Sequence, residues 1–507
     1  MYSIVSTAIV RGIESVEVLV EADVSDGMPI FTMVGFLASE VKEASERVRT
    51  ALRNSGYMLP PKRITVNLSP ADVRKSGSGF DLPIAISILS ALGIVEEERL
   101  DGMLIIGEVG LNGDILPVEG VLPLVTAAKE RGMKGCIIAV ENAAEARLVG
   151  DMAIYGVHNL CETIGILNGK ESTDTLTIHE EDVLMDAIGD FAEIHGQKFL
   201  KRACEVAVSG MHNLLIVGPP GSGKTMTAKR IPTILPPMTQ EEQLEVSKIY
   251  SVSGLFNKHK GLMTRRPFRS PHHTITPQGL VGGGKYPKPG EISLSHGGVL
   301  FLDEMTEFKK STLEVLRQPL EEKKIHLVRL TGTFTYPADF LLVGAMNPCA
   351  CGYYPDMQKC SCSSVTLKHY LEKISQPLLD RMDLCVEAPQ LKYEELTVKG
   401  EGETSEEIRR RVTCVHEIQR NRFEGTGIRY NSQIPASLLE KYCPLGEEQQ
   451  KYMEEIYTRM SLTARTYHKI LKVARTLADM DDAEQITLQH LNEAVCYRSM
   501  NKKYWER

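Results

Sequence analysis

Apolar and polar positions alternate in different ways along the chain, and the changes predict how it divides into parts. From residue 1 to about residue 170, strand-like runs such as "RITVNL" and "GCIIAV" alternate with helical patterns such as "DLPIAISILSALG". This pattern predicts an α/β domain over residues 1–170. The polar stretch that follows has little to bury, so we expect a linker over residues 171–190.

A second α/β pattern begins near residue 191 and continues to about residue 390. Its strand-like runs, among them "LLIV", "GGVLFL" and "DFLLVGAM", are apolar throughout, which is typical of strands buried on both faces of a parallel sheet. Residues 391–507 begin with a charged, glycine-containing connector and then have a helical pattern. We therefore predict an α/β, multidomain protein, with an α/β amino-terminal domain, a core with a parallel sheet and a helical carboxyl-terminal domain.

Charge and cysteine content restrict the classes of protein to which the chain can belong. The 507 residues include 58 Lys and Arg against 66 Asp and Glu, a net charge of −8, so any contact with nucleic acid must be local. The 11 cysteines, several within apolar helical patterns, favour reduced thiols over a secreted disulfide framework. The first residues lack the pattern of a secretory signal, and no window of about 18 uncharged apolar residues follows. We expect a cytoplasmic protein without a membrane segment.

The stretch "GPPGSGKT" matches the phosphate-loop pattern G-x-x-x-x-G-K-[ST] at every fixed position, between a strand-like run and a helical one. Glycines let backbone N–H groups surround phosphates, the lysine neutralises the β- and γ-oxygens, and the threonine hydroxyl binds Mg²⁺. A glycine-rich turn without a ligand is the alternative. The pattern predicts a site for ATP and Mg²⁺ formed by Gly218, Pro219, Pro220, Gly221, Ser222, Gly223, Lys224 and Thr225.

Polar residues follow two further strand-like runs. The carboxyl ends of neighbouring parallel strands lie near one crevice, so these residues are candidates for the same site. In "GGVLFLDE", we expect Asp303 to hold Mg²⁺ through water and Glu304 to polarise the attacking water. Asn347, at the end of "DFLLVGAMN", is a candidate for orienting that water or sensing the γ-phosphate. Taken singly, the acids also fit a helix amino-terminal turn, and the asparagine fits an ordinary turn.

Four cysteines behind this asparagine form two C-x-C pairs in "NPCACGYYPDMQKCSC". Four thiols are the ligand count of a structural zinc site, although C-x₂-C is the commoner spacing. Two reversible disulfides and four unliganded thiols are the alternatives. We expect structural Zn²⁺ in a cysteine-rich insert over residues 349–362, where it would stiffen the connection that follows Asn347. The expected ligands are Cys349, Cys351, Cys360 and Cys362.

The segment between Glu245 and Glu291 contains no acidic residue and a cluster of Lys and Arg. It fits a loop that follows the phosphate backbone of DNA by electrostatics. A solvated loop offset by acids nearby in space is the alternative. The later stretch "KKIHLVRLTGTFTYPADF" is equally well interpreted as a second DNA contact or as an ordinary edge hairpin. The candidate DNA contacts are Arg265, Arg266, Arg269, Lys285, Lys288 and Arg329.

Together, the motifs "GPPGSGKT", "GGVLFLDE", "AMNP" and "LLDRMDL" resemble those of AAA+ ATPases. In detail, "FRSPHHTITPQGLVGGG" and "NPCACG" resemble the magnesium-chelatase-like branch, and nearly the whole chain resembles the bacterial competence family called ComM or YifB. The resemblance implies a homo-oligomeric ring, usually a hexamer, with ATP bound between subunits. It also implies that Arg381 is the arginine finger and that Arg465, on a helical lid, is the second sensor arginine. Without the resemblance, an exposed helix arginine in a weak ion pair would describe either residue better.

The stretch "GEVGLNGDILPVEGVLPLVTAAKERGMKGCIIA" in the amino-terminal domain resembles the Lon-protease fold. Lon uses a Ser–Lys dyad, but the segment that resembles its lysine-bearing stretch is "EGVLPL", without a lysine. Ser76 and Ser78 are therefore expected to be turn hydroxyls, and we expect no proteolysis. A scaffold or a DNA-facing collar is the expected role of this domain.

The family resemblance implies an ATPase that converts ATP hydrolysis into movement along DNA. Such a helicase or translocase would promote branch migration when incoming DNA is integrated during natural transformation, with single-stranded or branched DNA as the partner. A magnesium-chelatase-like ATPase subunit that remodels a protein partner is the alternative. A binding module that uses nucleotide only as a switch is disfavoured, because Glu304 beside Asp303 and the finger Arg381 are the groups of an enzyme that turns over.

Overall fold

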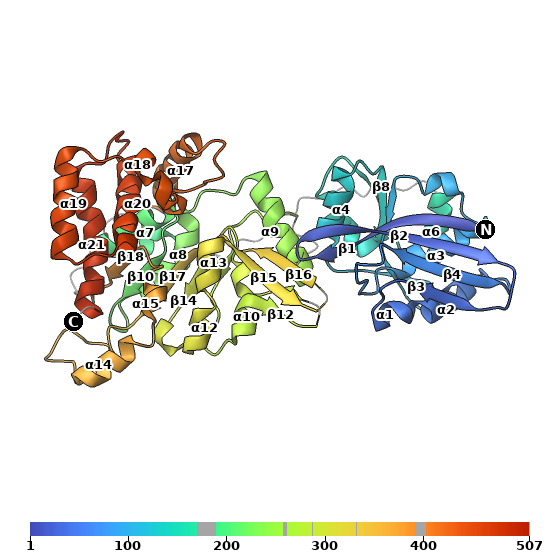
Figure 1. Ribbon diagram of the computed structural model, residues 1–507, viewed down its shortest axis with the longest axis horizontal. Coiled ribbons are helices and arrows are strands. Elements are labelled where there is room, and N and C mark those ends of the chain that lie inside the picture. Colours follow the sequence, from blue (N-terminus) through green and yellow to red (C-terminus); the bar gives the residue numbers. More distant parts are fainter. Residues whose placement is uncertain (170–188, 257–260, 286, 331, 391–401, 506–507) are drawn as a thin grey trace.

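The computed structural model describes residues 1–169, 189–256, 261–285, 287–330, 332–390 and 402–505. Figure 1 shows three parts in a row along the longest axis, with the N-terminus at one end and the C-terminus near the other. The first two parts are each built on a β-sheet and the third is helical, so the expected α/β, multidomain fold is confirmed. Most of the expected linker at 171–190, and the start of the domain expected from residue 391, lie outside the described residues.

A seven-stranded sheet forms the first part. Its strands are β1 (Tyr2–Arg11), β2 (Glu14–Ser25), β3 (Phe31–Val34), β4 (Arg63–Ser69), β5 (Met103–Ile105), β8 (Gly135–Ala139) and β9 (Ala153–Val157). They lie in the order β3-β4-β2-β1-β5-β8-β9; β1–β2 and β2–β4 are antiparallel and the other pairs are parallel. Burial alternates along β4, because its apolar residues face the core at every second position.

Helix α3 (Asp81–Ala91) of the first part is buried at every residue. The buried carboxylate of Asp81 is satisfied by Arg47, whose guanidinium donates two hydrogen bonds of 2.7 and 2.8 Å. A short pair of strands, β6 (Glu108–Val109) and β7 (Ile115–Leu116), is separate from the main sheet. The further helices of this part are α1 (Ser39–Lys42), α2 (Ala44–Asn54), α4 (Val121–Glu130), α5 (Val140–Arg147) and α6 (Leu160–Leu167).

The second part contains a five-stranded parallel sheet of β10 (Leu214–Val217), β11 (Phe268–Arg269), β14 (Val299–Leu302), β17 (Leu341–Met346) and β18 (Leu384–Glu387). The order is β11-β14-β17-β10-β18, and every pair is parallel. Strands β10, β14 and β17 are buried at every residue, as expected of strands covered on both faces. All five strands end at one edge of the sheet, which we call the carboxyl edge, and begin at the opposite, amino edge.

Several helices and short strands surround this sheet. A hairpin of β15 (Lys324–Arg329) and β16 (Gly332–Pro337) extends toward the first part (Figure 1). A two-residue pair, β12 (Gly282–Gly283) and β13 (Lys288–Pro289), lies apart from the main sheet. The helices are α7 (Lys198–Gly210), α8 (Lys224–Ile234), α9 (Gln240–Ser253), α10 (Pro277–Val281), α11 (Glu291–Leu294), α12 (Lys310–Glu314), α13 (Arg317–Glu322), α14 (Ser364–Leu371) and α15 (Gln376–Leu379).

The third part is helical and shares its core with the parallel sheet. Ile470 and Leu477, both on α20 (Ala464–Met480), pack in the same apolar cluster as Leu214 and Val343 of the sheet. Within the described residues, no helix has the length and apolar character that a membrane crossing requires. The helices are α17 (Ser405–Arg422), α18 (Leu439–Tyr442), α19 (Glu447–Arg459), α20 (Ala464–Met480) and α21 (Leu488–Tyr504).

The first and second parts meet at α9 and at the segment that contains β13. The buried hydroxyl of Ser251, on α9, donates to the carboxylate of Glu145. Lys288, on β13, forms an ion pair of 2.6 Å with Glu119 of the first part. A cavity of about 740 Å³ lies at this junction, lined by residues of both parts. The two parts are therefore joined by specific polar contacts as well as by the chain.

Candidate functional site

The phosphate-loop residues 218–225 connect the end of β10 to the start of α8, at the carboxyl edge of the parallel sheet. Gly223 caps α8 with φ of 84°, a conformation that favours glycine. At Gly218, a Cβ would lie 2.3 Å from the carbonyl oxygen of Ala388. Ser222 is 2% exposed, and its hydroxyl has no hydrogen-bond partner within the described residues. A close-fitting backbone loop with an unpaired buried hydroxyl fits a bound phosphate.

The ammonium of Lys224 lies over this loop. Its Nζ donates to two carbonyl oxygens of the loop at 2.7 and 2.9 Å, and to Oδ1 of Asn347 at 3.2 Å. Burial lowers the pKa of Lys224, and the charges of Asp303 and Glu304 oppose that shift. A triphosphate would offer the ammonium charged oxygens in place of neutral ones, and hydrogen bonds between ions are the stronger kind.

Thr225 and Asp303 are in direct contact, because the Thr225 hydroxyl donates to Oδ2 of Asp303 at 2.6 Å. The other oxygen, Oδ1, accepts from the backbone N–H of Glu304 at 2.9 Å. A hydroxyl and a carboxylate are oxygen donors of the kind that Mg²⁺ prefers, so the residues present fit this ion. The side chain of Glu304 is 62% exposed, and its φ of 47° lies in the left-handed region that is uncommon for residues other than glycine.

Asn347 follows β17, the strand between β14 and β10 in the sheet. Its side chain therefore emerges between the Asp303 pair and the phosphate loop, where it accepts from Lys224. The Tyr370 hydroxyl donates to the backbone carbonyl of Asn347 at 3.2 Å, and this hydrogen bond holds the backbone of Asn347 in place. The structure thus brings Lys224, Thr225, Asp303 and Asn347 together at one edge of the sheet.

Two histidines that no sequence pattern marked as functional, His272 and His273, also lie beside this group. They follow β11, and Nδ1 of His273 is 3.9 Å from Oε2 of Glu304. The signal in the sequence was weak, because β11 has only two residues and shows no hydrophobic period. Only the strand order, with β11 next to β14, indicates that a histidine pair after β11 meets an acid pair after β14.

The two arginines that the resemblance links to hydrolysis lie at the amino edge of the sheet. Arg381 precedes β18, and its backbone carbonyl accepts from the side-chain amide of Asn213, which precedes β10. The paired residues of β10 and β18 separate this edge from the phosphate loop by on the order of 10 Å. Arg465, near the start of α20, lies here too, because Oε1 of Glu321 accepts from both guanidiniums, at 2.6 Å from Arg381.

Further contacts hold Arg381 in place at this edge. Its guanidinium donates to the backbone carbonyls of Pro377 and Arg317 at 2.5 and 3.1 Å, and the residue is 9% exposed. Arg381, Arg465 and Glu321 line one cavity of about 670 Å³, and no phosphate-loop residue lines it. In this conformation, the two arginines face away from the nucleotide site of their own chain.

The four cysteines of the insert lie together. The Sγ atom of Cys349 is 3.3 Å from that of Cys351 and 3.8 Å from that of Cys360, and Cys351 and Cys360 are 3.6 Å apart. With Cys362, all four sulfurs lie within 4.8 Å of one another. A tetrahedral site with Zn–S bonds of about 2.3 Å places its sulfurs about 3.8 Å apart, so the four thiols fit Zn²⁺.

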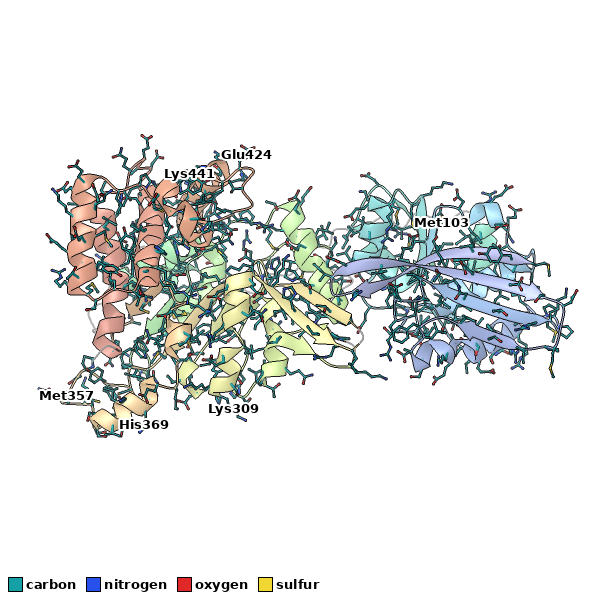
Figure 2. All side chains as sticks on the ribbon, viewed as in Figure 1. Met103, Lys309, Met357, His369, Glu424 and Lys441 are labelled. Atoms are coloured by element: carbon teal, nitrogen blue, oxygen red, sulfur yellow. The ribbon has the colours of Figure 1, made fainter. Side chains whose placement is uncertain are left out.

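One of the four thiols is more acidic than usual. A backbone hydrogen bond from Tyr353 lowers the pKa of Cys351 to about 6, although desolvation opposes it, and a thiolate is the form that binds zinc. Although backbone hydrogen bonds oppose the shift, desolvation and the neighbouring thiols raise the pKa values of Cys360 and Cys362, so without a metal the cluster holds its negative charge on Cys351. The Tyr354 N–H donates to Sγ of Cys349 at 3.3 Å. Figure 2 shows Met357, in the turn between the two pairs, and His369, on α14, at the outer corner of this region.

The cysteine-rich insert packs against the phosphate loop. Gly352, between the cysteine pairs, packs so closely on Pro220 that a Cβ would lie 2.6 Å from the proline Cδ. On its other side, the ring of Tyr354 meets the edge of Tyr504, at the end of α21, with ring centroids 5.9 Å apart. The cysteine cluster is therefore wedged between the phosphate loop and the last helix.

Two of the candidate DNA contacts form ion pairs and hydrogen bonds with other residues of the chain. Arg266, whose side chain is 7% exposed, pairs with Glu242 at 3.1 Å and donates to two backbone carbonyls. Arg269 forms a bidentate pair with Glu291, with distances of 2.6 and 2.7 Å. Both guanidiniums therefore have acidic partners within the chain, which argues against Arg266 and Arg269 as DNA contacts.

The remaining candidates lie nearer the surface. Lys288 is half-exposed but pairs with Glu119, and Arg265 and Lys285 also have partners within the chain. Arg329, near the tip of the hairpin, is exposed and donates to the carbonyl of Val328 at 2.9 Å. Acidic residues that are distant in sequence, on α9, α11 and the first part, thus neutralise much of the positive charge of the acid-free segment. This agrees with the alternative of a loop offset by acids nearby in space. Two further cations of the segment, Lys258 and Lys260, lie outside the described residues.

Within the described residues, no hydrogen bond joins Ser76 or Ser78 to a lysine. The Ser78 hydroxyl donates to the carboxylate of Glu108, and the buried Nζ of Lys75 donates to the carbonyl of Pro70. A Ser–Lys dyad needs an amine that accepts the serine proton. Ser76 and Ser78 line the cavity at the junction, together with residues of the second part.

Consecutive stretches of the chain match three descriptions of magnesium chelatase. Residues 20–142 match "Subunit ChlI of Mg-chelatase", residues 190–396 match "Magnesium chelatase, subunit ChlI", and residues 402–498 match "Magnesium chelatase, subunit ChlI C-terminal". The middle match contains the phosphate loop, the acid pair, Asn347, the cysteine cluster and Arg381.

Curated relatives match along almost the whole chain. The chain is 42% identical over 495 residues to the competence protein ComM of Haemophilus influenzae, covering 96% of each protein. It is 39% identical over 501 residues to the uncharacterized protein YifB of Salmonella typhimurium, covering 99% of this chain and 97% of that protein. A shorter match, 29% identical over 144 residues, links 28% of this chain to 26% of Lon protease 2 of Bacillus subtilis.

Proposed function

The chain belongs to the ComM and YifB family of magnesium-chelatase-like AAA+ ATPases, and from this membership we propose that it is a ring-forming motor acting on DNA. The activity we propose is that of a cytoplasmic helicase or translocase that promotes branch migration during natural transformation and recombination. The proposal of a ring is supported by the position of Arg381 and Arg465, which lie at the sheet edge opposite the phosphate loop of their own chain. The choice of DNA is supported by the similarity to a competence protein.

We assign the chemistry of ATP hydrolysis to side chains at the carboxyl edge. Lys224 exchanges its neutral partners for the β- and γ-oxygens of ATP and neutralises their charge. Glu304 accepts a hydrogen bond from the attacking water and draws its proton away as the water attacks. Asn347, fixed by Tyr370, orients that water or senses the γ-phosphate. Thr225 and Asp303 would hold Mg²⁺, which supplies further neutralisation of the phosphates when bound.

A second copy of the chain completes the site. Arg381 of one protomer stabilises the charge that develops on the γ-phosphate held by its neighbour, and Arg465 lies on the same face. The carboxylate of Glu321 pairs with both guanidiniums, so the two arginines lie next to each other on this face. A contact between the amino edge of one chain and the carboxyl edge of the next is heterologous, and such contacts form a ring when the rotation between subunits closes. We propose a hexamer.

We also propose that the four cysteines hold a structural Zn²⁺. The sulfur spacing supports this assignment, and a short loop without an apolar core gains its order from metal binding. Metal analysis of the purified protein is expected to find one zinc per chain, and Cys360→Ser is expected to lose most of it. Cys161→Ser, at an exposed cysteine of the first part, is the matched control and should keep the metal. Wild-type protein without zinc would remove the proposal.

The experiment that tests the DNA assignment is ATP hydrolysis with and without forked or single-stranded DNA. We expect several-fold stimulation that falls as salt rises, because phosphate contacts are weakened by salt. Arg329→Ala is expected to reduce the stimulation, whereas Lys309→Ala, at a lysine on the opposite side of the second part from α17 (Figure 2), should leave it unchanged. Unwinding of the fork, lost in Lys224→Ala, would establish the motor.

A second candidate function is favoured by the match of residues 190–396 to a magnesium chelatase subunit. In this alternative, the ATPase remodels a protein partner rather than DNA. Stimulation of hydrolysis by a protein and none by DNA would select this alternative and exclude the DNA motor. The ATPase, the shared site and the ring would be unaffected by that outcome.

A further inference from the structure

The carboxylate of Glu321 pairs with both of the arginines that the proposed function gives to the neighbouring subunit. Its Oε1 lies 2.6 Å from the guanidinium of Arg381 and also accepts from the guanidinium of Arg465. The side chain of Arg381 is 9% exposed, whereas those of Glu321 and Arg465 are half-exposed. All three residues line the cavity at the amino edge, so an anion that enters this cavity meets both guanidiniums beside Glu321.

A carboxylate and a γ-phosphate compete for the same guanidiniums. Arginine binds both groups through its planar set of N–H donors, and the phosphate has the greater charge and one more oxygen. Within one chain, Glu321 neutralises two arginines that would otherwise repel each other. To reach the γ-phosphate of a neighbouring subunit, the arginines must exchange this carboxylate for the phosphate. The ion pairs with Glu321 therefore oppose the transfer.

Arg381 is connected to α13 at both ends of that helix. Its guanidinium donates to the backbone carbonyl of Arg317, the first residue of α13, at 3.1 Å, and pairs with Glu321 in the last turn. After a single residue in the left-handed conformation, Lys323, the chain enters β15 of the hairpin, which lies beside α13 (Figure 1). A change in the partner of Arg381 therefore acts directly on the helix that leads into the hairpin.

Helix α13 and the hairpin pack as one unit. Leu320 of the helix lies in the same buried apolar cluster as Ile325 and Leu327 of β15. The backbone N–H of Ala338, just after β16, donates to the carbonyl of Lys323 at 2.8 Å and closes the base of the hairpin. Closely packed elements shift together rather than deform. A movement of the last turn of α13 is therefore passed to the hairpin, whose far end carries the candidate DNA contact Arg329.

We propose that Glu321 is a positioning residue that holds Arg381 and Arg465 within their own subunit until the γ-phosphate of the neighbouring subunit displaces it. Displacement frees the last turn of α13 and, through it, the hairpin with Arg329. DNA at the hairpin and phosphate at the arginines then favour each other, because a coupling of this kind is reciprocal. Glu321 does not touch the nucleotide, and the inference rests on the finger that the proposed function assigns to Arg381.

The test compares ATP hydrolysis by full-length Glu321→Gln and wild type, each with and without forked DNA. The amide keeps the size of the side chain and loses the charge that holds the guanidiniums, so kcat without DNA is expected to rise roughly 3- to 10-fold. The ratio of the rates with and without DNA is expected to fall by about half or more, because the arginines are already released.

Glu322→Gln is the matched control for this variant. It removes the same charge one residue later, where the carboxylate accepts from Gln318 at 2.8 Å. Both its rate without DNA and its stimulation by DNA are expected to stay within about twofold of the wild type. The double variant Arg381→Ala/Glu321→Gln is expected to hydrolyse ATP no faster than Arg381→Ala, because the effect of Glu321 passes through the finger.

Several results would overturn the inference. They are an unchanged or lower rate without DNA in Glu321→Gln, an equal rise in Glu322→Gln, or a double variant that is faster than Arg381→Ala. An unchanged ratio of the rates with and without DNA would overturn the coupling to the hairpin. A gain in rate does not arise from lost folding, and if thermal unfolding shows that Glu321→Gln fails to fold, Glu321→Ala repeats the test.

Arg381→Ala distinguishes the failure of this inference from the failure of the proposed function. Full activity in Arg381→Ala contradicts the proposed finger, whereas an inactive Arg381→Ala beside an unchanged Glu321→Gln contradicts only the role of Glu321. A wild type that DNA does not stimulate contradicts both the DNA motor and the coupling to the hairpin. The rate without DNA then decides alone whether Glu321 restrains the arginines.

Discussion

His212, one of several buried histidines, makes the stability of the ATPase core depend on pH. The residue is 1% exposed, and its Nε2 is 2.8 Å from the hydroxyl of Thr476 on α20. Burial lowers the pKa of His212 to about 4, although Asp383 opposes the shift. In the unfolded chain the pKa is about 6.5, so between those values the unfolded chain takes up a proton that the folded chain refuses. Stability is therefore present above about pH 6.5 and is lost as pH falls toward 4.

The loss attributable to His212 is about 1 kcal/mol at pH 5.5, or roughly 2 °C in melting temperature. We expect His212→Gln, which keeps a hydrogen-bonding group toward Thr476, to have a smaller fall in melting temperature between pH 7 and pH 5.5 than the wild type. His326→Gln, at a histidine whose side chain is 40% exposed, is the matched control and should follow the wild type. Identical pH dependence in the wild type and His212→Gln would contradict this account.

At the scale of elements, the contact between the cysteine insert and the phosphate loop predicts that the insert sets ATP affinity. Gly352 has φ of 87°, and a Cβ there would lie 2.6 Å from the rigid ring of Pro220. Overpacking of this kind costs roughly 1–3 kcal/mol. We expect Gly352→Ala to shift the phosphate loop and to raise KM for ATP about tenfold, since 1.4 kcal/mol corresponds to a factor of ten. Zinc content should not change, because the four thiols remain.

Gly425→Ala supplies the control for this variant. Gly425 also has a positive φ, of 73°, but a Cβ there meets nothing within 4 Å. Alanine at either position pays the same conformational cost, and only alanine at residue 352 adds the clash with Pro220. Equal values of KM in the two variants would show that the insert does not support the phosphate loop.

The same scale shows how far the sequence alone could predict the structure. The runs that form β10, β14 and β17 are apolar at every position, so the buried parallel sheet and the polar residues at its edge were predictable. The partners of Arg266 and Arg269 were not, because Glu242 and Glu291 are more than 20 residues away and only the fold brings them close. His273 was missed for a related reason. Its strand has two residues and becomes visible only through its pairing with β14.

At the scale of the whole molecule, the three parts divide the proposed work. The parallel sheet separates the edge that binds nucleotide from the edge that carries Arg381 and Arg465, and the helical part shares a core with this sheet. The first part is attached through Ser251 on α9 and through Lys288, and Lys288 is one of the cations that the sequence assigned to DNA. A rigid attachment of this kind suits a collar that moves with each subunit. Loss of the first part is therefore expected to expose Lys288 as well as to remove a scaffold.

A site shared between subunits predicts that two inactive proteins restore each other. Lys224→Ala loses the phosphate contact in its own site, and Arg381→Ala loses the finger that it gives its neighbour, so each alone is expected to lose on the order of 10³ in kcat. In mixed rings, an Arg381→Ala subunit keeps an intact phosphate loop, and a Lys224→Ala neighbour supplies the missing finger. With random mixing of equal amounts, roughly one quarter of the sites would be complete, and hydrolysis should return in that proportion.

Mixing Lys224→Ala with the Lys224→Ala/Arg381→Ala double variant is the control, because no subunit then has an intact phosphate loop. If both mixtures stay inactive although mixed rings form, each chain must complete its own site, and the position of Arg381 at the far edge of the sheet would have to change on nucleotide binding.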